Sequence, residues 1–303
     1  KIIDFYKFNL IEYLPKLGFI KSRITYFLIF FLTVFKLHKI LKKQKPEYLI
    51  IHLITFIPMF LMVLFNYETK FILRISGYPK LNIFRRTFWK IAGRKISYIT
   101  TPTISTLNLL KSNKIFPEEK IIYIPDPVLN IEQIQKKKND IDTLESQLSK
   151  QNSLITIGRL TKQKNFGFLI DVFHKLQNKH KNLNLFIIGE GEEKQKLVNK
   201  INELKLTQKI FLTGYKNNVF NYLKNSKMFI STSLWEDPGF VLLEAGYCNK
   251  TVLSSNCPNG PVEILENGKN GFLFKSNSQK DFIEKFEEVM NSSDLIINKK
   301  KIL

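Results

Sequence analysis

The sequence predicts an α/β fold made of two doubly wound domains, on three observations. Short apolar runs rich in β-branched residues alternate with helix-forming segments along most of the chain, a pattern typical of parallel sheets covered by helices. The 303 residues are enough for two domains of ordinary size. A polar stretch at residues 128–152 separates two alternating halves. We therefore expect an N-terminal domain at residues 1–127, a connector, and a C-terminal domain at residues 153–303.

The first two apolar segments of the N-terminal half raise the question of membrane insertion. Ile24–Phe35 is too short to span a bilayer and is followed by lysines, so we expect a buried or interfacial helix. Tyr48–Phe65 is uncharged and reaches the length of a transmembrane helix. Because its start is β-branched and Thr55 interrupts it, we prefer a strand at Tyr48–His52 and a helix around Pro58–Phe65. A membrane span remains the alternative.

The rest of the N-terminal half alternates regularly. The expected strands are Lys70–Ile75, Ile96–Thr100 and Lys120–Ile124, and the expected helices are Leu81–Gly93 and Pro102–Lys111. Pro102 suits the first position of a helix, where its missing amide hydrogen has no cost. The connector that follows is rich in Lys, Asn, Asp and Gln, so we expect it to stay largely unburied.

The C-terminal half alternates more clearly. The expected strands are Leu154–Ile157, Leu183–Ile188, Lys209–Thr213, Met228–Ser233, Thr251–Ser255 and Gly271–Phe274. The expected helices are Phe166–Leu176, Glu193–Leu204, Val219–Lys224, Phe240–Cys248, Pro261–Glu266 and Gln279–Met290. Ligands of doubly wound sheets bind beyond the carboxyl ends of the strands, and the candidate motifs of this half lie there.

The stretch Trp235–Ala245 is the most informative in the chain. It follows an expected buried strand and opens an apolar helix. Pro238 suits the first helical position, and Gly239 lets a ligand approach the backbone closely. Free amides and the dipole at such a helix start attract an anion. Glu236 and Glu244 bracket this position, and carboxylates there suit sugar hydroxyls rather than phosphate. The stretch therefore predicts a site for a molecule with phosphate and sugar parts.

A basic loop follows the first strand of the same half. In Gly158–Asn165, Gly158 permits the turn. Arg159 and Lys164 can reach one diphosphate: the arginine guanidinium donates two parallel hydrogen bonds, and the lysine ammonium acts as a point charge. The alternative is an ordinary solvated basic loop.

Together these residues resemble the retaining, family-4 type glycosyltransferases of the GT-B fold, in particular those that build bacterial surface polysaccharide. The resemblance lies in the E-x₇-E spacing of Glu236 and Glu244, inside W-E-D-P-G-F-V-L-L-E-A, and in the G-R-L…K-N pattern about 70 residues earlier. It implies two Rossmann-like domains facing a central cleft and a nucleotide-sugar donor such as a UDP- or GDP-sugar. It also implies that Arg159 and Lys164 hold the donor diphosphate, Glu236 the transferred sugar and Glu244 the ribose.

Further donor-binding residues follow from the same resemblance and, for Tyr215, from its position after the third strand of this half. The expected donor-binding set is Gly158, Arg159, Lys164, Gly189, Glu190, Gly191, Tyr215, Glu236, Gly239, Phe240, Val241 and Glu244. Gly189-Glu190-Gly191 is similar to the loop near the nucleoside in these enzymes, although an ordinary βα turn remains open. NAD binding is rejected because Lys194 stands where the third glycine should be.

The expected catalytic residues are Glu236, Arg159, Lys164 and His52. His52 and Arg74 end neighbouring expected strands of the first domain, and the resemblance favours a His near the reacting sugar; a buried structural His is the alternative. We expect no metal and no cofactor. Asp140-Ile-Asp142 matches a D-x-D metal motif, but it lies in the connector, so we interpret it as chance.

Charge and composition bear on the partners. The net charge of +21 indicates an anionic partner, although the Ile- and Asn-rich composition explains part of the Lys excess. The basic, aromatic first domain suggests peripheral binding to anionic lipid at the inner face of the cytoplasmic membrane and a glycan or polyprenyl-linked acceptor. The two cysteines, Cys248 and Cys257, favour a reducing cytoplasm over a disulfide framework.

The sequence thus predicts sugar transfer with retention in bacterial polysaccharide, O-antigen or capsule synthesis. One alternative is a nucleotide-sugar epimerase of the same fold, and another is a non-catalytic basic protein that binds nucleic acid or membrane. Nucleic acid is not expected, because the Phe residues follow core periods. The Gly-rich loop that opens the family's first domain has no counterpart before Lys21, which leaves open that the N-terminal domain is incomplete.

Overall fold

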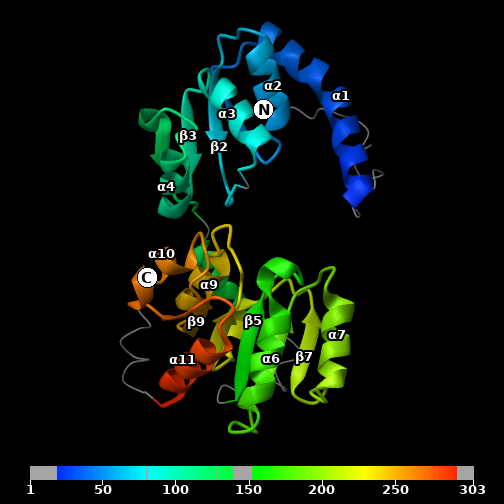
Figure 1. Cartoon of the computed structure of the whole chain (residues 1–303), viewed down its shortest axis with the longest axis vertical. Helices are drawn as coiled ribbons and strands as arrows, with labels where there is room; N and C mark the ends of the chain where they lie inside the picture. The colour runs from blue at the N-terminus through cyan, green and yellow to red at the C-terminus, as the bar shows by residue number, and fades with distance from the viewer. Residues whose placement is uncertain (1–18, 80, 128, 139–151, 292–303) are drawn as a thin grey trace. The chain divides into compact units, whose positions relative to one another are not determined.

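A computed structural model describes residues 19–79, 81–127, 129–138 and 152–291 (Figure 1). It divides into two compact units, Lys1–Ile124 and Pro125–Leu303. Each unit contains one parallel sheet with helices packed against it, as the alternation of strands and helices predicts. Asp140 and Asp142 of the D-x-D match lie outside the described residues.

The N-terminal unit has a four-stranded sheet of order β1-β2-β3-β4, with all neighbours parallel. The strands are β1 (Tyr48–His52), β2 (Lys70–Arg74), β3 (Tyr98–Thr101) and β4 (Ile121–Tyr123), and the helices are α1 (Phe19–Lys43), α2 (Phe56–Leu64), α3 (Ile83–Gly93) and α4 (Ile104–Ser112). Helix α4 begins after Pro102 because Thr103 is its cap and accepts a hydrogen bond from the amide of Thr106.

The predicted split of Tyr48–Phe65 into a strand and a helix is confirmed. Helix α2 begins two residues before Pro58, which then lies in the first turn, where a missing amide hydrogen is tolerated. Helix α1 is longer than predicted: it continues through the lysines that follow Phe35, and Leu41 of this extension is buried. Among the described helices, none combines the length and the apolar character needed to cross a bilayer.

The C-terminal unit has a six-stranded parallel sheet of order β10-β9-β8-β5-β6-β7. The strands are β5 (Ser153–Ile157), β6 (Asn184–Ile188), β7 (Ile210–Gly214), β8 (Met228–Ser231), β9 (Thr251–Ser255) and β10 (Phe272–Phe274). The chain runs from β5 outward through β6 and β7, then returns to the other side of β5 for β8. The β5–β8 boundary is therefore the switch point of this doubly wound sheet, where such sheets bind ligands.

Helices cover both faces of this sheet. They are α5 (Ile131–Lys137), α6 (Phe166–Leu176), α7 (Lys194–Glu203), α8 (Phe220–Lys224), α9 (Phe240–Tyr247), α10 (Pro261–Ile264) and α11 (Gln279–Asn291). Helices α6 and α11 pack on each other over one face (Figure 1). Neighbouring strand residues alternate between two buried clusters: Leu154 belongs to the cluster under α6 and α11, and Ile155 belongs to the one under α8 and α9.

Part of the connector packs on the C-terminal unit, contrary to the expectation that it stays largely unburied. Helix α5 forms within it, capped by Asn130, and its Ile134 is 3% exposed. Gln135 Nε2 donates to Tyr247 Oη at 2.7 Å, and Lys138 Nζ donates to the carbonyl of Tyr247 at 3.0 Å. The polar composition did not indicate this packing, because the packing needs only one apolar side chain, Ile134, and two long polar ones, Gln135 and Lys138.

Candidate functional site

Lys164 and Glu236 form an ion pair at the switch point of the C-terminal sheet. Lys164 Nζ lies 2.7 Å from Glu236 Oε1 and 2.9 Å from Oε2. The carboxylate side chain is 3% exposed and the lysine side chain 16% exposed. In a buried pair of this kind each charge depends on the other, because removal of one partner leaves the other charge buried and uncompensated.

Backbone contacts hold the two loops together around this pair. Thr232 Oγ1 donates to the carbonyl of Lys164 at 2.9 Å, and the amide of Leu234 donates to the carbonyl of Gln163 at 2.8 Å. Gln163 Nε2 also donates to the carbonyl of Trp235 at 3.0 Å. The loop after β5 and the loop after β8 therefore form one rigid edge at the carboxyl ends of these strands.

The glutamate receives a second donor inside its own loop. Ser233 Oγ donates to Glu236 Oε1 at 2.5 Å, so this oxygen accepts from both Ser233 and Lys164. A carboxylate has about four acceptor positions, and three of them are used here. Glu236 thus keeps about one acceptor position for a ligand hydroxyl.

Helix α9 starts at Phe240, as predicted. Pro238 is not its first residue, contrary to the expectation, because Gly239 adopts φ +93° and a right-handed helix cannot include that conformation. A Cβ at Gly239 would lie 3.1 Å from Glu236 Cγ, so the glycine also makes room for the glutamate side chain. Phe240 and Val241 form the first turn of α9 and are partly exposed.

Arg159 lies on the loop after β5 and is exposed, unlike Lys164. Gly158, which was expected to permit the turn, does not adopt a left-handed conformation. It makes room for the Lys164 stem, whose Cε would lie 3.0 Å from a Cβ there. Arg159 and Lys164 therefore share a loop, but only the lysine is held in place by Glu236. The arginine remains available to an anion.

The Gly189-Glu190-Gly191 loop packs directly on this basic loop. The amide of Leu160 donates to the carbonyl of Glu190 at 2.9 Å, and a Cβ at Gly189 would lie 1.9 Å from the carbonyl oxygen of Gly158. The glycines thus permit close packing of two βα loops. The Glu190 side chain is exposed and pairs with Lys194 at 2.9 Å.

Glu244 lies on α9, partly buried and near the lysines of α5. Burial raises the pKa of its carboxyl above the ordinary value, and the charge of Lys137 partly opposes this shift. The sequence did not indicate a lysine at this position, because α5 lies more than 100 residues before α9 in the chain. A polar ligand group such as a ribose hydroxyl could donate a hydrogen bond to this carboxylate and so compensate for the water that burial removes.

Two predicted residues belong to other elements. Tyr215 follows the edge strand β7 and is 73% exposed. His52 belongs to the N-terminal unit, where it is paired in register with Arg74 at the carboxyl ends of β1 and β2. His52 is exposed, so the alternative of a buried structural His is wrong. Arg74 Nη1 donates to the carbonyl of Ile124 at 2.8 Å. Their part in the site remains a prediction.

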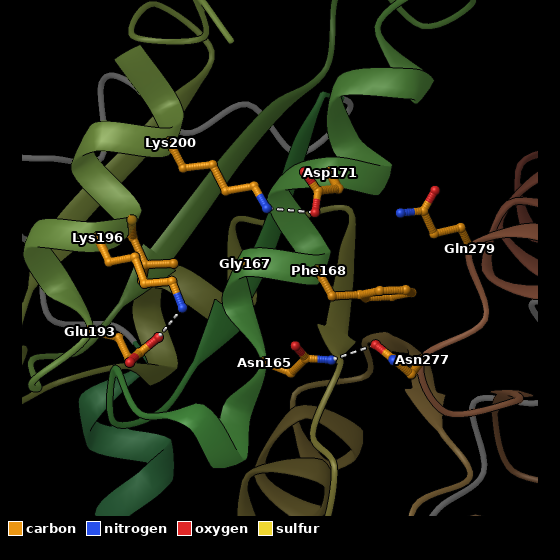
Figure 2. Close-up of a pocket in the computed structure, with 10 residues that line it drawn as sticks. Asn165, Gly167, Phe168, Asp171, Glu193, Lys196, Lys200, Asn277 and Gln279 are labelled. Atoms are coloured by element: carbon orange, nitrogen blue, oxygen red, sulfur yellow. Dashed lines mark hydrogen bonds and ion pairs between the residues drawn. The ribbon is translucent and has the colours of Figure 1, made fainter. Parts of the chain in front are cut away.

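A pocket of about 370 Å³ lies between α6, α7 and the segment before α11 (Figure 2). Ion pairs between Lys200 and Asp171 and between Lys196 and Glu193 line it. It contains none of the predicted donor-binding residues. In the part of the chain that the structure describes, no group of three or more His, Cys, Asp or Glu residues is placed to hold a metal ion.

Residues 138–301, more than half of the chain, match the family described as glycosyl transferases group 1. The chain belongs to this family. The match covers the Lys164–Glu236 pair and both predicted glutamates, so the family assignment rests on the unit that carries the site.

Curated relatives agree with the assignment. The uncharacterized glycosyltransferase MJ1059 of Methanocaldococcus jannaschii is 32% identical over 249 residues, which are 76% of this chain and 61% of that protein. The N-acetylgalactosamine-N,N'-diacetylbacillosaminyl-diphospho-undecaprenol 4-alpha-N-acetylgalactosaminyltransferase of Campylobacter jejuni is 23% identical over 242 residues, 77% of this chain and 63% of that protein. The chain spans less than two thirds of the length of both.

Solved structures share the fold. HepE of Anabaena in complex with UDP has a TM-score of 0.71 at 16% identity, over 89% of this chain and 75% of that one. TarM of Staphylococcus aureus, in complex with fondaparinux, alpha-GlcNAc-glycerol and UDP, has a TM-score of 0.70 at 22% identity, over 89% and 53%. The predicted fold class, α/β of the GT-B type with Rossmann-like units, is thereby confirmed.

Proposed function

We propose that this chain transfers a sugar from a nucleotide-sugar donor, such as a UDP- or GDP-sugar, with retention at the anomeric carbon. The single observation that carries the proposal is the contact of Lys164 with Glu236 at the β5–β8 switch point. A cation that can bind a diphosphate thus lies beside a carboxylate that can bind sugar hydroxyls, in a chain that belongs to the group 1 family.

The donor diphosphate would lie between Arg159, Lys164 and the amides of Gly239 and Phe240. Lysine has three N–H donors, and two of them point to Glu236 in the unliganded chain. One donor remains for a phosphate oxygen. As the diphosphate leaves, these groups would stabilise its growing negative charge, and they need little rearrangement because the loops are already fixed.

The sugar would be held by Glu236 and the ribose by Glu244. Because Glu236 is 2% exposed, the sugar reaches it only through its remaining acceptor position or after a local opening of the loop. His52 of the N-terminal unit would lie near the reacting sugar. Retention is proposed from the resemblance to family-4 enzymes.

The acceptor would be a glycan or a polyprenyl-linked sugar, in the synthesis of bacterial capsule, O-antigen or a related polysaccharide. The Campylobacter relative is named for a diphospho-undecaprenol acceptor, and a 28% identical relative from Staphylococcus aureus is named for capsular polysaccharide biosynthesis. We also propose peripheral binding to anionic lipid at the cytoplasmic membrane. The lysines in the last turn of α1 and the exposed Phe31 and Phe35 on the same helix support this.

A panel of nucleotide sugars tests the donor assignment. The cognate donor at 100 times its Kd should add about 2.7 kcal/mol to the free energy of unfolding, seen as a rise in Tm. Incubation without acceptor followed by product analysis separates transfer from epimerisation, since an epimerase would convert the donor itself. Absence of stabilisation by every UDP- and GDP-sugar would contradict the proposal. Vesicle flotation at low salt, with anionic and neutral lipid compared, tests membrane binding.

A further inference from the structure

The loop after β9 holds the backbone of Glu236 from both sides. The amide of Glu236 donates to the carbonyl of Pro258 at 3.1 Å, and Asn259 Nδ2 donates to the carbonyl of Glu236 at 2.7 Å. Asn259 is 2% exposed. Both polar groups of the Glu236 peptide backbone are therefore bound by two consecutive residues of one neighbouring loop.

The conformation of this loop is unusual at two consecutive residues and suits a close approach to the Glu236 segment. Asn259 adopts φ +70°, a region that asparagine tolerates better than most residues. Gly260 adopts φ +137°, and a Cβ there would lie 1.7 Å from the carbonyl oxygen of Pro238. The 258–260 loop thus touches the segment that carries the glutamate at two points, Glu236 and Pro238.

The side chain and the backbone of Glu236 are held by different groups. Ser233 and Lys164 bind the carboxylate, whereas Pro258 and Asn259 bind the main chain. Ser255, at the end of β9, donates through Oγ to the carbonyl of Ser233 at 2.6 Å. Strand β9 and its loop therefore support the whole segment from residue 233 to residue 238.

We propose that Asn259 is a positioning residue that sets the place of the Glu236 carboxylate against the transferred sugar. The inference rests on the proposed function of Glu236 and goes beyond it by naming the group that fixes its main chain. Asn259 binds the main chain of Glu236, the residue proposed to hold the transferred sugar, so it should govern sugar transfer and sugar choice rather than nucleotide affinity. A displacement of about 1 Å at such a group lowers turnover by about 10²-fold.

The test compares Asn259→Ala and Asn259→Asp with the wild-type chain. The aspartate variant keeps the size of the side chain and replaces the Nδ2 donor with a carboxylate oxygen, which cannot donate to the Glu236 carbonyl and adds a negative charge beside it. The alanine variant removes the donor without adding a charge, so a loss of kcat in both variants tests the bond. We expect kcat for the cognate donor to fall at least about 10-fold and approach 10²-fold. The Kd for the free nucleoside diphosphate, measured by calorimetry, should change less than about 3-fold, because the bond from Asn259 goes to the residue that is proposed to hold the sugar.

Asn256→Ala is the matched control. Asn256 lies on the same loop, is exposed, and accepts a hydrogen bond from the amide of Ser276, away from Glu236. This variant should keep kcat near the wild-type value. A similar loss of kcat in Asn256→Ala and Asn259→Ala would mean that general loosening of the loop is responsible, and it would overturn the inference.

A double-mutant cycle separates the inference from the function on which it rests. If Asn259 acts through Glu236, Asn259→Asp should lower kcat much less in a Glu236→Gln chain than in the wild type. Fully additive losses, or a fall in nucleotide affinity that parallels kcat, would overturn the inference and leave the role of Glu236 intact. Wild-type turnover in Glu236→Gln itself would overturn the proposed role of Glu236 and the inference with it.

Discussion

Lys164 Nζ lies 2.7 Å from Glu236 Oε1, although 72 positions separate the two residues in the chain. They meet because β5 and β8 are neighbours in the sheet, with Ile155 paired to Phe229. The site therefore depends on strand order as much as on the two side chains. Substitutions of single residues can test each part of this arrangement.

Replacing Lys164 with Met should destabilise the chain strongly. The variant keeps the stem that packs on Gly158 and removes the ammonium, which leaves the Glu236 carboxylate buried without its counterion. Breaking a buried pair in this way costs about 3 kcal/mol or more, and urea denaturation measures the loss.

The control for this experiment is Lys196→Met. Lys196 is 72% exposed and pairs with Glu193 at 3.2 Å, so its loss should cost less than about 1 kcal/mol. Equal effects of the two substitutions would mean that the Lys164–Glu236 pair is no stronger than a surface pair.

Replacing Arg159 with Ala should weaken nucleotide binding without unfolding the chain. Arg159 is exposed on the same loop as Lys164, so it contributes little to the packing of the unit. We expect the Kd for the nucleoside diphosphate to rise about 10-fold or more, as for the loss of a charge-assisted contact. Calorimetry gives the Kd, and thermal unfolding of the unliganded chain checks that Tm is unchanged.

Lys162→Ala is matched to this variant, because Lys162 is also a cation of the loop after β5 with its side chain accessible to solvent. It should change the Kd far less, since no diphosphate contact is predicted for it. A loss as large as that in Arg159→Ala would indicate a general effect of loop charge instead of a specific contact.

The pH dependence of stability should report on Glu244. Because burial raises the pKa of this carboxyl, the folded chain holds its proton more tightly than the unfolded chain. The resulting stabilisation is present below the ordinary pKa of 4.5 and is lost as the pH rises through the folded pKa. Relative to the wild type, Glu244→Gln should therefore gain stability from about pH 4.5 upward, measured by urea denaturation across pH.

Glu287→Gln should give the opposite sign. Burial alone would raise the pKa of Glu287, but hydrogen bonds from Lys179 and His180 outweigh it and lower the pKa. Stability from this group is present above the ordinary pKa and lost as the pH falls through the lower folded value. The variant should thus lose stability relative to the wild type as the pH rises. The same sign for both variants would contradict the assignment at Glu244.

Gly260→Ala should be poorly tolerated. A Cβ there would lie 1.7 Å from the carbonyl oxygen of Pro238, and the backbone has φ +137°. We expect a loss of about 3 kcal/mol or more, since steric overlap adds to backbone strain.

Gly268→Ala provides the comparison for this loss. Gly268 has φ +90°, and no atom lies within 4 Å of the position that a Cβ would take there, so only backbone strain of about 1 kcal/mol should appear. A cost at Gly260 no larger than that at Gly268 would show that the 258–260 loop can move away from Pro238, and would weaken the case for a rigid support of Glu236.

Local patterns were enough to predict most elements of the C-terminal unit. The helix Phe166–Leu176 and the strand Thr251–Ser255 were predicted with their observed bounds, because hydrophobic periodicity and flanking turn residues are read from neighbouring positions. Helix α5 was missed because its docking depends on Tyr247, far along the chain. The start of α9 at Phe240 was predicted, but the expected place of Pro238 at the first helical position was wrong, because the left-handed Gly239 lies between Pro238 and the helix.

The sequence by itself determined the alternating α/β class, the two glutamates at a helix start, and the basic loop after a strand. These follow from residue type and short-range spacing. The tertiary structure alone decided that β5 lies beside β8, that Lys164 pairs with Glu236, and that Asn259 holds the main chain of that glutamate. The physical reason is that strand order and loop packing depend on contacts between residues far apart in the chain, which no local pattern records.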